Sequence, residues 1–502
     1  MSGNRSQRPF WRRPLLVAAA LAALWLGLPP LLGLRGVYLA TDVLLFVLLA
    51  GVLFLGAWMR RQRHLREPWR RVFHQKRAAV SAVVLVVFAV IGLADSIHFR
   101  KPLPPAPGAA ETAWSVEVLS VLDVLLAHLR EREEQTYSAP LATRLYVRQP
   151  VERGGRQVRE YPRLRHGGAH LADPERQWAG DVARLALAGA GGGLALAALA
   201  ALGLVLLLAR ARGESLARTA AGVWRGEGPV PWRTVLATVA VVCAVAGVLA
   251  GLSLHYHVLG TDKVGTDVLY LSLKSVRTGL VIGTLTTLIM LPFAILLGIM
   301  AGYFRGWVDD VIQYLYTTLN SIPGVLLIAA AVLSIQVYIE NHPQLFETAT
   351  DRADLRLLAL CVILGITSWT GLCRLLRGET LKVRELDYIQ AAVAFGVRPF
   401  VILGRHVLPN VMHIVLIVVV LDFSGLVLAE AVLSYVGVGV DPATISWGNM
   451  INGARLELAR EPPVWWSLVA AFCFMFALVL SANLFADAVR DAFDPRLREQ
   501  PA

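Results

Sequence analysis

Long apolar runs alternate with polar loops along most of this 502-residue chain. A helix needs about 20 largely apolar residues to cross the hydrocarbon core of a bilayer. Ten runs meet that requirement, and they lie near 14–34, 37–58, 78–97, 181–209, 234–255, 276–302, 309–337, 355–376, 409–436 and 464–486. The pattern therefore predicts an all-α polytopic membrane protein with about ten transmembrane helices.

The first apolar run follows several arginines, as the apolar part of a secretory signal peptide would. It lacks a cleavage site of the A-x-A type, and a second apolar run comes directly after it. We therefore expect an uncleaved membrane anchor rather than a signal peptide.

Arginine and lysine are concentrated in a subset of the loops, which predicts the orientation of the chain. Short cytoplasmic loops of membrane proteins are enriched in these residues. The segments 1–13, 60–77 and 210–233 are rich in arginine, whereas the loops 256–275 and 437–463 contain few basic residues. With an even number of spans, this distribution places both termini in the cytoplasm.

A polar insertion at 98–180 separates the third apolar run from the fourth. A segment of this length crosses the membrane largely regardless of its own charge, so we expect it outside the cell membrane. Helical spacing of apolar residues predicts one amphipathic helix within it, formed by Trp114, Val118, Val121, Leu122, Leu125 and Leu129. We expect this helix to cap the neighbouring helices, and the alternative is a docking surface for a partner.

The composition agrees with a membrane environment, since 56% of the residues are hydrophobic and only 17% are charged. A typical soluble domain has about 25% charged residues. The net charge is +12, but the arginines are not interleaved with aromatic residues as in base-stacking surfaces, so we expect no nucleic-acid partner. No metal site is predicted either, because the four cysteines lie in apolar runs and His255 and His257 alone are a weak signal.

The stretch DYIQAAVAFGVRPFVILGRHVLPN, residues 387–410, is polar and broken by glycine and proline, although apolar runs flank it. The order of the loops places 377–408 in the cytoplasm. A helix is expected to end at Gly396, the chain to restart at Pro399, and the next span to open at Pro409. The sequence thus predicts a short helix, a sharp bend and a second short stretch beneath the membrane.

Small residues line this predicted helix. Ala391, Ala392 and Ala394 leave little bulk on its surface, so the backbone of another protein could approach closely. A helix of this kind suits a docking element that passes the motion of a partner to the spans. The alternative is a loop that only links two spans.

This segment resembles the cytoplasmic signature of permeases of binding-protein-dependent ABC importers, which reads E-A-A, three residues, G, nine residues, I-x-L-P. Its positions are matched by Gln390, Ala391, Ala392, Gly396, Leu408 and Pro409. Gln390 replaces the glutamate, and His406 replaces the isoleucine. The Asp-Tyr pair that ends at Tyr388 is similar to the version in dipeptide and oligopeptide importers.

Further stretches resemble the same subfamily. On the outer side HVLGTDKVGTDVL contains Thr261, Asp262 and Asp267 and is similar to H-P-L-G-T-D-x-x-G-R-D-V-L, with two departures from that pattern. AGYFRGWVDD is similar to the A-G-Y-x-G-G turn of the family, with Arg305 where a glycine is usual. The stretches at 430–451 and 483–497 are the most specific matches, so that the resemblance covers about 255–498.

The resemblance implies the C-type permease of a dipeptide/oligopeptide or nickel ABC importer in the bacterial inner membrane, with an N-terminal extension. The expected parts are extra spans at 1–97, the insertion at 98–180, a hairpin at 181–255 and a type I importer core at 256–498. The implied partners are a sister permease in a heterodimer, two ATPase subunits, a periplasmic substrate-binding protein, a peptide substrate and membrane lipid.

The chain has no glycine-rich loop ending in Gly-Lys-Ser/Thr, which ATP hydrolysis by this class of motor requires. We therefore expect no catalytic residue and no cofactor on this chain, with ATP and magnesium bound by the partner subunits. The resemblance implies coupling to those ATPases through the residues Tyr388, Gln390, Ala391, Ala392, Gly396, Leu408 and Pro409.

Ionisable residues inside spans are costly and usually functional. Asp422 and Glu430 lie eight residues apart in one apolar run, and with Ser434 they are candidates for the translocation pathway. The alternative is a carboxyl group held by a neighbouring serine or backbone group.

On the outer side, the candidates for a gate or a binding-protein contact are Thr261, Asp262, Asp267 and Trp447. A simpler expectation for Trp447, together with Trp465 and Trp466, is an aromatic belt at the membrane interface. Two other classes of function stay open: an ion-coupled secondary transporter that uses Asp422 and Glu430, and a membrane scaffold without transport.

Overall fold

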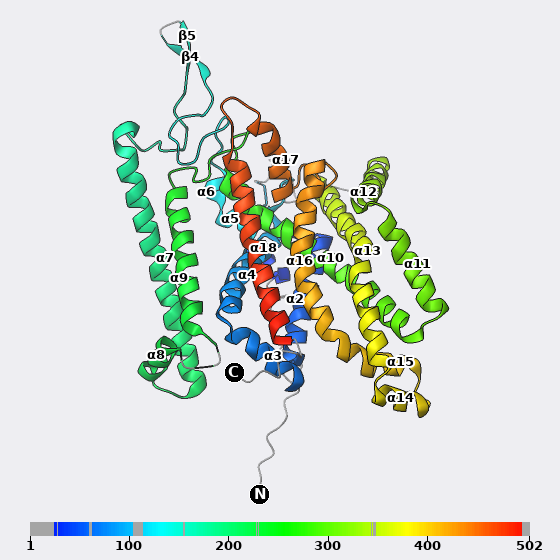
Figure 1. The fold of residues 1–502 in the computed structure, drawn as a ribbon. Coiled ribbons are helices and arrows are strands. Elements are labelled where there is room, and N and C mark those ends of the chain that lie inside the picture. The colour runs from blue at the N-terminus through cyan, green and yellow to red at the C-terminus, as the bar shows by residue number, and fades with distance from the viewer. Residues whose placement is uncertain are drawn as a thin grey trace.

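Membrane-length helices dominate the computed structural model. It describes residues 25–27, 29–59, 63–103, 114–153, 156–226, 228, 230–342, 344 and 348–493. Among them, eight helices are long and apolar enough to cross a membrane, and they lie side by side in Figure 1. They are α4 (Lys76–Asp95), α7 (Pro174–Arg212), α9 (Trp232–Ser253), α10 (Val268–Phe304), α12 (Gly324–Asn341), α13 (Ala349–Arg384), the continuous helix Pro399–Val436 and α18 (Trp466–Phe493). This confirms the predicted all-α polytopic class.

Two predicted spans, at 14–34 and 37–58, are not among these eight helices. Most of the run at 14–34 lies outside the described residues. The run at 37–58 forms α2 (Ala40–Met59), whose stretch Ala40–Phe54 is a shorter apolar helix.

The single span predicted at 309–337 is wrong in detail, because two helices replace it. α11 (Trp307–Ser321) ends before Ile322, and α12 begins at Gly324. Pro323 between them has no N–H to donate, and its ring disfavours helical backbone at the preceding residue. Ile322 is accordingly extended, with φ −89° and ψ 130°.

Helices α10 and α13 pack closely along much of their length, and glycines make that approach possible. A Cβ atom at Gly302 of α10 would lie only 2.6 Å from the Cβ atom of Thr380 on α13. A Cβ atom at Gly298 would lie 2.8 Å from the carbonyl oxygen of Cys373. Any side chain at these positions would push the two helices apart, so α10 and α13 form the tight centre of the C-terminal bundle.

Strands occur only at a few places in the described part of the chain. β1 (Arg35–Val37), β2 (His98–Arg100) and β3 (Leu119–Ser120) form an antiparallel sheet in that order. β4 (Gln149–Arg153) and β5 (Arg156–Glu160) form a hairpin that projects at the top of Figure 1. Each strand of the larger sheet comes from the N-terminal extension or the insertion, so that sheet ties these two segments together.

The single amphipathic helix predicted in the insertion is wrong. Two short helices, α5 (Val121–Leu125) and α6 (Ala127–Arg130), follow β3 instead. The reason is a helix cap: Ser120 Oγ accepts from the backbone N–H of Asp123, and the Asp123 carboxylate accepts from the backbone N–H of Ser120. Leu129 packs beside Leu252 and Val258, as we expect of a segment that caps the neighbouring helices.

A buried ionic cluster joins the N-terminal extension to the C-terminal bundle. Arg277 of α10 donates to Asp42 Oδ1 of α2 from Nη2 at 2.6 Å and from Nε at 3.0 Å. His98 Nδ1 lies 2.8 Å from the other oxygen of Asp42. The backbone N–H and the hydroxyl of Thr41 both donate to Asp354 of α13, and Arg277 Nη2 lies 3.8 Å from that carboxylate.

Lys274 extends this cluster to the insertion. It lies three residues before Arg277 and therefore on nearly the same face of α10. Its ammonium group lies 2.5 Å from Asp123 and 3.8 Å from Asp95, at the end of α4. We call Lys274 and Arg277 the α10 cation pair. These two side chains bind carboxylates from α2, α4, α5 and α13, so they join the N-terminal extension, the insertion and the C-terminal bundle.

The two ends of the bundle carry different elements. The arginine-rich helices α3 (Arg63–His74) and α8 (Leu216–Arg225) lie at the bottom of Figure 1. The short helix α14 (Asp387–Ala394) lies at that same end. The β4–β5 hairpin and α17 (Trp447–Leu458) lie at the other end. This arrangement matches the alternation of loops that the arginine pattern predicts.

Replacing Arg277 with methionine is expected to destabilise the protein strongly. The substitution keeps much of the side-chain volume but leaves the buried Asp42 carboxylate without its cation. Removing one partner of a buried ion pair costs about 3–5 kcal/mol. Thermal unfolding of the purified protein in lipid nanodiscs measures the effect as a lower midpoint temperature.

Lys382→Met is the matched control for that experiment. Lys382 also pairs with a carboxylate, that of Glu379 at 3.0 Å, but the lysine side chain is 76% exposed. Exposed pairs contribute about 0–1 kcal/mol. Equal midpoint temperatures for the two variants would contradict the structural role of Arg277.

Candidate functional site

Helix α14 lies at the tip of a bent segment that leaves the membrane bundle. Residues 380–395 are fair helix formers and lead up to the predicted helix end at Gly396, but the structure divides this stretch between two helices. α13 ends at Arg384, and Leu386 is extended with φ −72° and ψ 140° before α14 begins. All residues at this break are fair helix formers, so propensity alone gave no sign of it.

Gly396 ends α14 as predicted. It has a positive φ of +74°, which glycine adopts without steric cost. The backbone N–H of Gly396 donates to the carbonyl of Val393, and that of Val397 donates to the carbonyl of Ala392. These two bonds form a Schellman motif, which caps the last carbonyls of the helix and turns the chain sharply.

Pro409 lies in the first turn of α16 as predicted, but it does not open the span, because helical structure begins ten residues earlier. α15 (Pro399–Ile402) continues through a π-helical turn, η2 (Leu403–Val407), into α16 (Leu408–Val436). Proline inside a helix lacks an N–H and clashes with the preceding turn, and a π turn is a common site of such an irregularity. The π turn ends two residues before Pro409, so the helix passes this proline without ending.

Buried side chains fix this segment to the bundle. Ile389 of α14 and Ile402 of α15 are completely buried. They belong to one apolar cluster with Met290 of α10 and with Trp369 and Leu376 of α13. The segment is therefore packed against the two helices that form the tight centre of the bundle.

The tip of the same segment is exposed and apolar. Phe395 is 86% exposed and Phe400 is 73% exposed. Large exposed aromatic side chains that lie close together in a chain often mark a protein interface. Neither phenylalanine is among the residues predicted from the sequence, although both lie within 387–410. We call the bent segment 387–402 the stub.

The signature residues occupy different positions on and near the stub. The Gln390 side chain donates to the carbonyl of Arg384 at 2.9 Å and so bridges the break before α14. Tyr388 OH accepts from Asn410 Nδ2 at 2.8 Å, which links α14 to the start of α16. Ala391 is exposed and Ala392 is half-buried. Asn410 was not predicted as a functional residue, and its one signal in the sequence is its place directly after Leu408 and Pro409.

The turn between α10 and α11 lies beside the stub. Arg305, where the family has a glycine, adopts φ 56° and ψ −170°, and Gly306 also has a positive φ. Such a conformation costs a non-glycine residue about 1–3 kcal/mol. The Arg305 guanidinium pairs with Glu385 at 2.5 Å, and the rings of Phe304 and Phe400 lie 6.1 Å apart.

The candidate pathway residues lie in different surroundings. Glu430 is 2% exposed, and its carboxylate accepts from the Ser434 hydroxyl at 2.8 Å. A Cβ atom at Gly448 of α17 would lie 2.7 Å from the same carboxylate, so Glu430 marks a close joint between α16 and α17. Asp422 is half-buried and has no hydrogen-bond partner within the described residues.

Most of the residues predicted for an outer gate or a binding-protein contact are buried in the protein. Thr261 and Asp267 are completely buried, and Asp267 caps the start of α10 by accepting from two backbone N–H groups. Asp262 accepts from the backbone N–H of Val264 and Thr266 and so closes a tight turn.

The aromatic belt predicted at the membrane interface is wrong for two of its three tryptophans. Trp447 is 1% exposed and Trp466 is 2% exposed. Their indole N–H groups donate to the backbone carbonyls of Ser272 and Thr261, so both rings are part of the interior. Only Trp465 is well exposed.

A buried charged triad holds the loop before α10, residues 254–267, to the insertion; we call this loop the outer segment. His257 Nδ1 lies 2.8 Å from Asp267 and Nε2 lies 3.5 Å from Glu134. Burial alone would lower the pKa of His257, but the hydrogen bond to Asp267 and the Glu134 carboxylate outweigh it and raise that pKa to about 9. Burial would raise the pKa of Glu134, but His257 and three backbone N–H groups lower it to about 2.

The triad makes the stability of the outer segment depend on pH. The pKa of His257 is raised from 6.5, so its stabilising effect is complete below pH 6.5 and is lost as the pH rises from 6.5 to 9. A shift of this size corresponds to about 3 kcal/mol. Thermal unfolding at pH 6 and pH 9 is expected to show this loss in the natural protein and a smaller one in His257→Gln. An equal pH dependence in both proteins would contradict the stabilising role of protonated His257.

A bundle of membrane-length helices, capped by the insertion at one end and carrying an exposed apolar stub at the other, defines a polytopic membrane protein. Residues 294–499 match the family described as binding-protein-dependent transport system inner membrane component. The glutathione transport system permease protein of Pectobacterium atrosepticum is 31% identical over 242 residues, which cover 48% of this chain and 73% of that relative. The chain belongs to this family of importer permeases, and it is a multi-pass transporter subunit rather than an enzyme.

Other relatives show similar coverage. The dipeptide transport system permease protein of Bacillus subtilis is 28% identical over 242 residues, 48% of this chain and 69% of the relative. The oligopeptide transport system permease protein of Haemophilus influenzae is 27% identical over 243 residues, 48% of this chain and 71% of the relative. About half of this chain therefore lies outside each of these matches.

Proposed function

We propose that this chain is the membrane-spanning permease of an ATP-driven importer of peptides. The names of its relatives, which include glutathione, dipeptide and oligopeptide permeases, support a peptide substrate. Its partners in this proposal are a different sister permease, two ATPase subunits that bind ATP and magnesium, and a substrate-binding protein outside the membrane. This chain itself binds no cofactor.

The stub is the observation on which this proposal depends. Its exposed tip, with Phe395 and Phe400, offers an apolar surface to an ATPase subunit. Its buried base, with Ile389 and Ile402, lies among the side chains of α10 and α13. Because interiors are closely packed, a displacement of the tip is passed to these helices rather than absorbed at the base.

Alternating access follows from this connection. An ATPase pair that closes on ATP would pull two stubs, one from each permease, and so favour one of two packings of the spans. The stub then lies in the cytoplasm together with α3 and α8, whose arginines fit that side, and both termini lie there as well. The insertion 98–180 lies outside, where it meets extracytoplasmic partners.

Within the span α16, Asp422 is the residue that we assign to the translocation pathway. It is a half-buried carboxyl group in the middle of an apolar helix, and it has no hydrogen-bond partner among the residues that the structure describes. An ionisable group in such a place is costly unless it has a function, and the amino group of a peptide is the complementary ligand. Glu430 has a structural role in this account, because Ser434 already occupies its carboxylate.

Replacing Gly396 with leucine, or Ala391 with aspartate, is expected to abolish peptide uptake and substrate-stimulated ATP hydrolysis. No described atom of the chain lies within 4 Å of a Cβ atom at Gly396, so the leucine costs the fold only the penalty of a positive φ, about 1–2 kcal/mol. The larger loss comes from steric or charge conflict with the docked ATPase. Uptake of a labelled dipeptide and ATPase activity of the purified complex measure both effects.

Gly213→Leu is the matched control for the glycine variant. Gly213 also ends a helix with a positive φ, +68°, and also has no neighbouring atom within 4 Å. Both variants therefore carry the same backbone penalty, and both are expected to insert into the membrane. Normal uptake by Gly396→Leu, or equal loss in Gly213→Leu, would refute the docking role.

Replacing Asp422 with asparagine distinguishes an ATP-driven pathway from a proton-coupled one. We expect uptake to fall at least tenfold, since a charge contact with the peptide is lost, while ATP hydrolysis by the complex continues. We also expect the natural complex to keep its uptake when an ionophore collapses the proton gradient. Uptake that needs the gradient and no ATPase partner would support a secondary transporter instead.

A further inference from the structure

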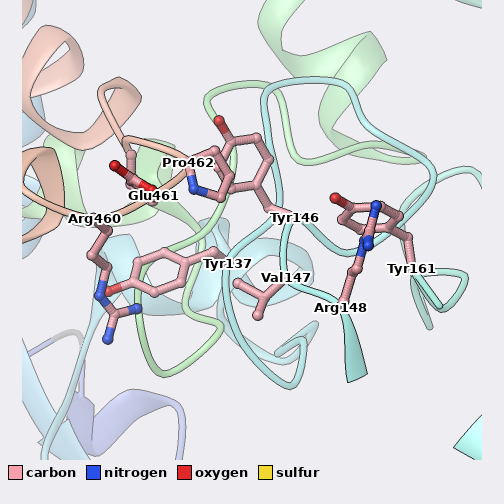
Figure 2. Close-up of a pocket in the computed structure, with 9 residues that line it drawn as sticks. Tyr137, Tyr146, Val147, Arg148, Tyr161, Arg460, Glu461 and Pro462 are labelled. Carbon is pink, nitrogen blue, oxygen red and sulfur yellow. The ribbon is translucent and has the colours of Figure 1, made fainter. Parts of the chain in front are cut away.

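A pocket on the outer end of the molecule joins the insertion to the loop between α17 and α18. Its volume is about 420 Å³. Figure 2 shows the side chains that line it, which include Tyr137, Tyr146, Arg148 and Tyr161 of the insertion and Arg460 and Glu461 of the loop. The family match begins at residue 294, so the insertion half of this pocket lies outside the matched region. We call it the Arg–Tyr pocket.

Two arginines hold positive charge at opposite ends of this pocket (Figure 2). The guanidinium carbon of Arg148 lies 5.2 Å from the centre of the Tyr161 ring, and that of Arg460 lies 5.1 Å from the centre of the Tyr137 ring. These cation–π contacts orient both groups. Both arginine side chains are exposed, and neither forms an ion pair in the part of the chain that the structure describes. Glu461 also lines the pocket and Glu457 lies near Arg460, so Arg148 is the cation with less negative charge around it.

Contacts with buried residues fix two of the side chains that line the pocket. Tyr137 is 2% exposed, and its hydroxyl donates to Glu457. The Tyr146 hydroxyl donates to the carbonyl of Pro463, and its ring meets the buried Trp466 edge-on at 4.8 Å. A surface whose side chains are already fixed loses little conformational entropy when a partner binds.

The chain around the pocket is strongly basic. Between residues 144 and 166 there are only two acidic residues, Glu152 and Glu160. The arginines of this stretch are Arg144, Arg148, Arg153, Arg156, Arg159, Arg163 and Arg165. The β4–β5 hairpin carries part of this charge away from the bundle, at the top of Figure 1. A charged arm of this kind attracts an acidic partner and raises its rate of association.

We propose that the Arg–Tyr pocket docks an acidic surface of the substrate-binding protein, with one carboxylate of the partner at Arg148 and another at Arg460. This inference rests on the proposed importer function and adds a contact made by the insertion. A protein fits better than a free small molecule, because the pocket is open, its two cations are separated, and the basic arm extends well beyond it. The insertion thus gives the permease its own means of selecting its binding protein.

Charge reversal at the two arginines tests this docking site. The probe is the substrate-binding protein that copurifies with the complete complex, and its affinity for that complex in nanodiscs is measured directly. Arg148→Glu and Arg460→Glu are each expected to raise Kd about tenfold, and the effect is expected to shrink at high salt. Arg148→Lys, which keeps the charge but not the flat guanidinium, is expected to lie between the natural protein and Arg148→Glu.

Arg176→Glu is the matched control. It makes the same change of charge on the outer side, at a side chain that is 90% exposed and does not line the pocket. An unchanged thermal midpoint shows that each variant is folded. Equal affinities for the natural protein and both pocket variants would overturn the docking site, as would an affinity change limited to short acidic peptides. Failure of the natural complex to import peptide would instead overturn the proposed function, while the binding measurement still decides the docking site.

Discussion

The pairing of the α10 cation pair with buried carboxylates is the interaction on which the architecture depends. Arg277 and Lys274 bring together α2, α4, α5 and α13, and none of these carboxylates would be stable in the interior alone. Buried ion pairs therefore attach the N-terminal half firmly to the rest of the protein. It shares an ionic core with the permease bundle, and the two halves are expected to fold as one unit.

The two ends of the helix bundle are held by different kinds of contact. At the outer end the insertion closes over the start of α10, through the triad of His257, Asp267 and Glu134. At the inner end, close packing at Gly298 and Gly302 of α10 brings α13 next to the base of the stub. The contacts that fix one end of the bundle and the close packing beside the stub at the other end thus both involve α10.

Local chemistry was predictable from the sequence, and long-range contacts were not. Gly396 was found because a helix end with positive φ favours glycine, a rule that needs only neighbouring residues. The break at Leu386 and the single helix wrongly expected around Val121 depend on packing and capping that apolar spacing does not reveal. The pairing of Arg277 with Asp42 joins residues 235 positions apart, and no local pattern encodes it.

The length of α10 has a mechanical consequence. Its 37 residues extend about 55 Å at 1.5 Å per residue, well beyond a hydrocarbon layer of about 30 Å. One helix therefore reaches from the ionic cluster on one side to the strained turn at Arg305 on the other. If its outer end stays anchored, a change of ten degrees in its tilt sweeps the inner end through about 10 Å. A small rotation of α10 near the ion pairs would then produce a large displacement of its other end, on the opposite side of the membrane.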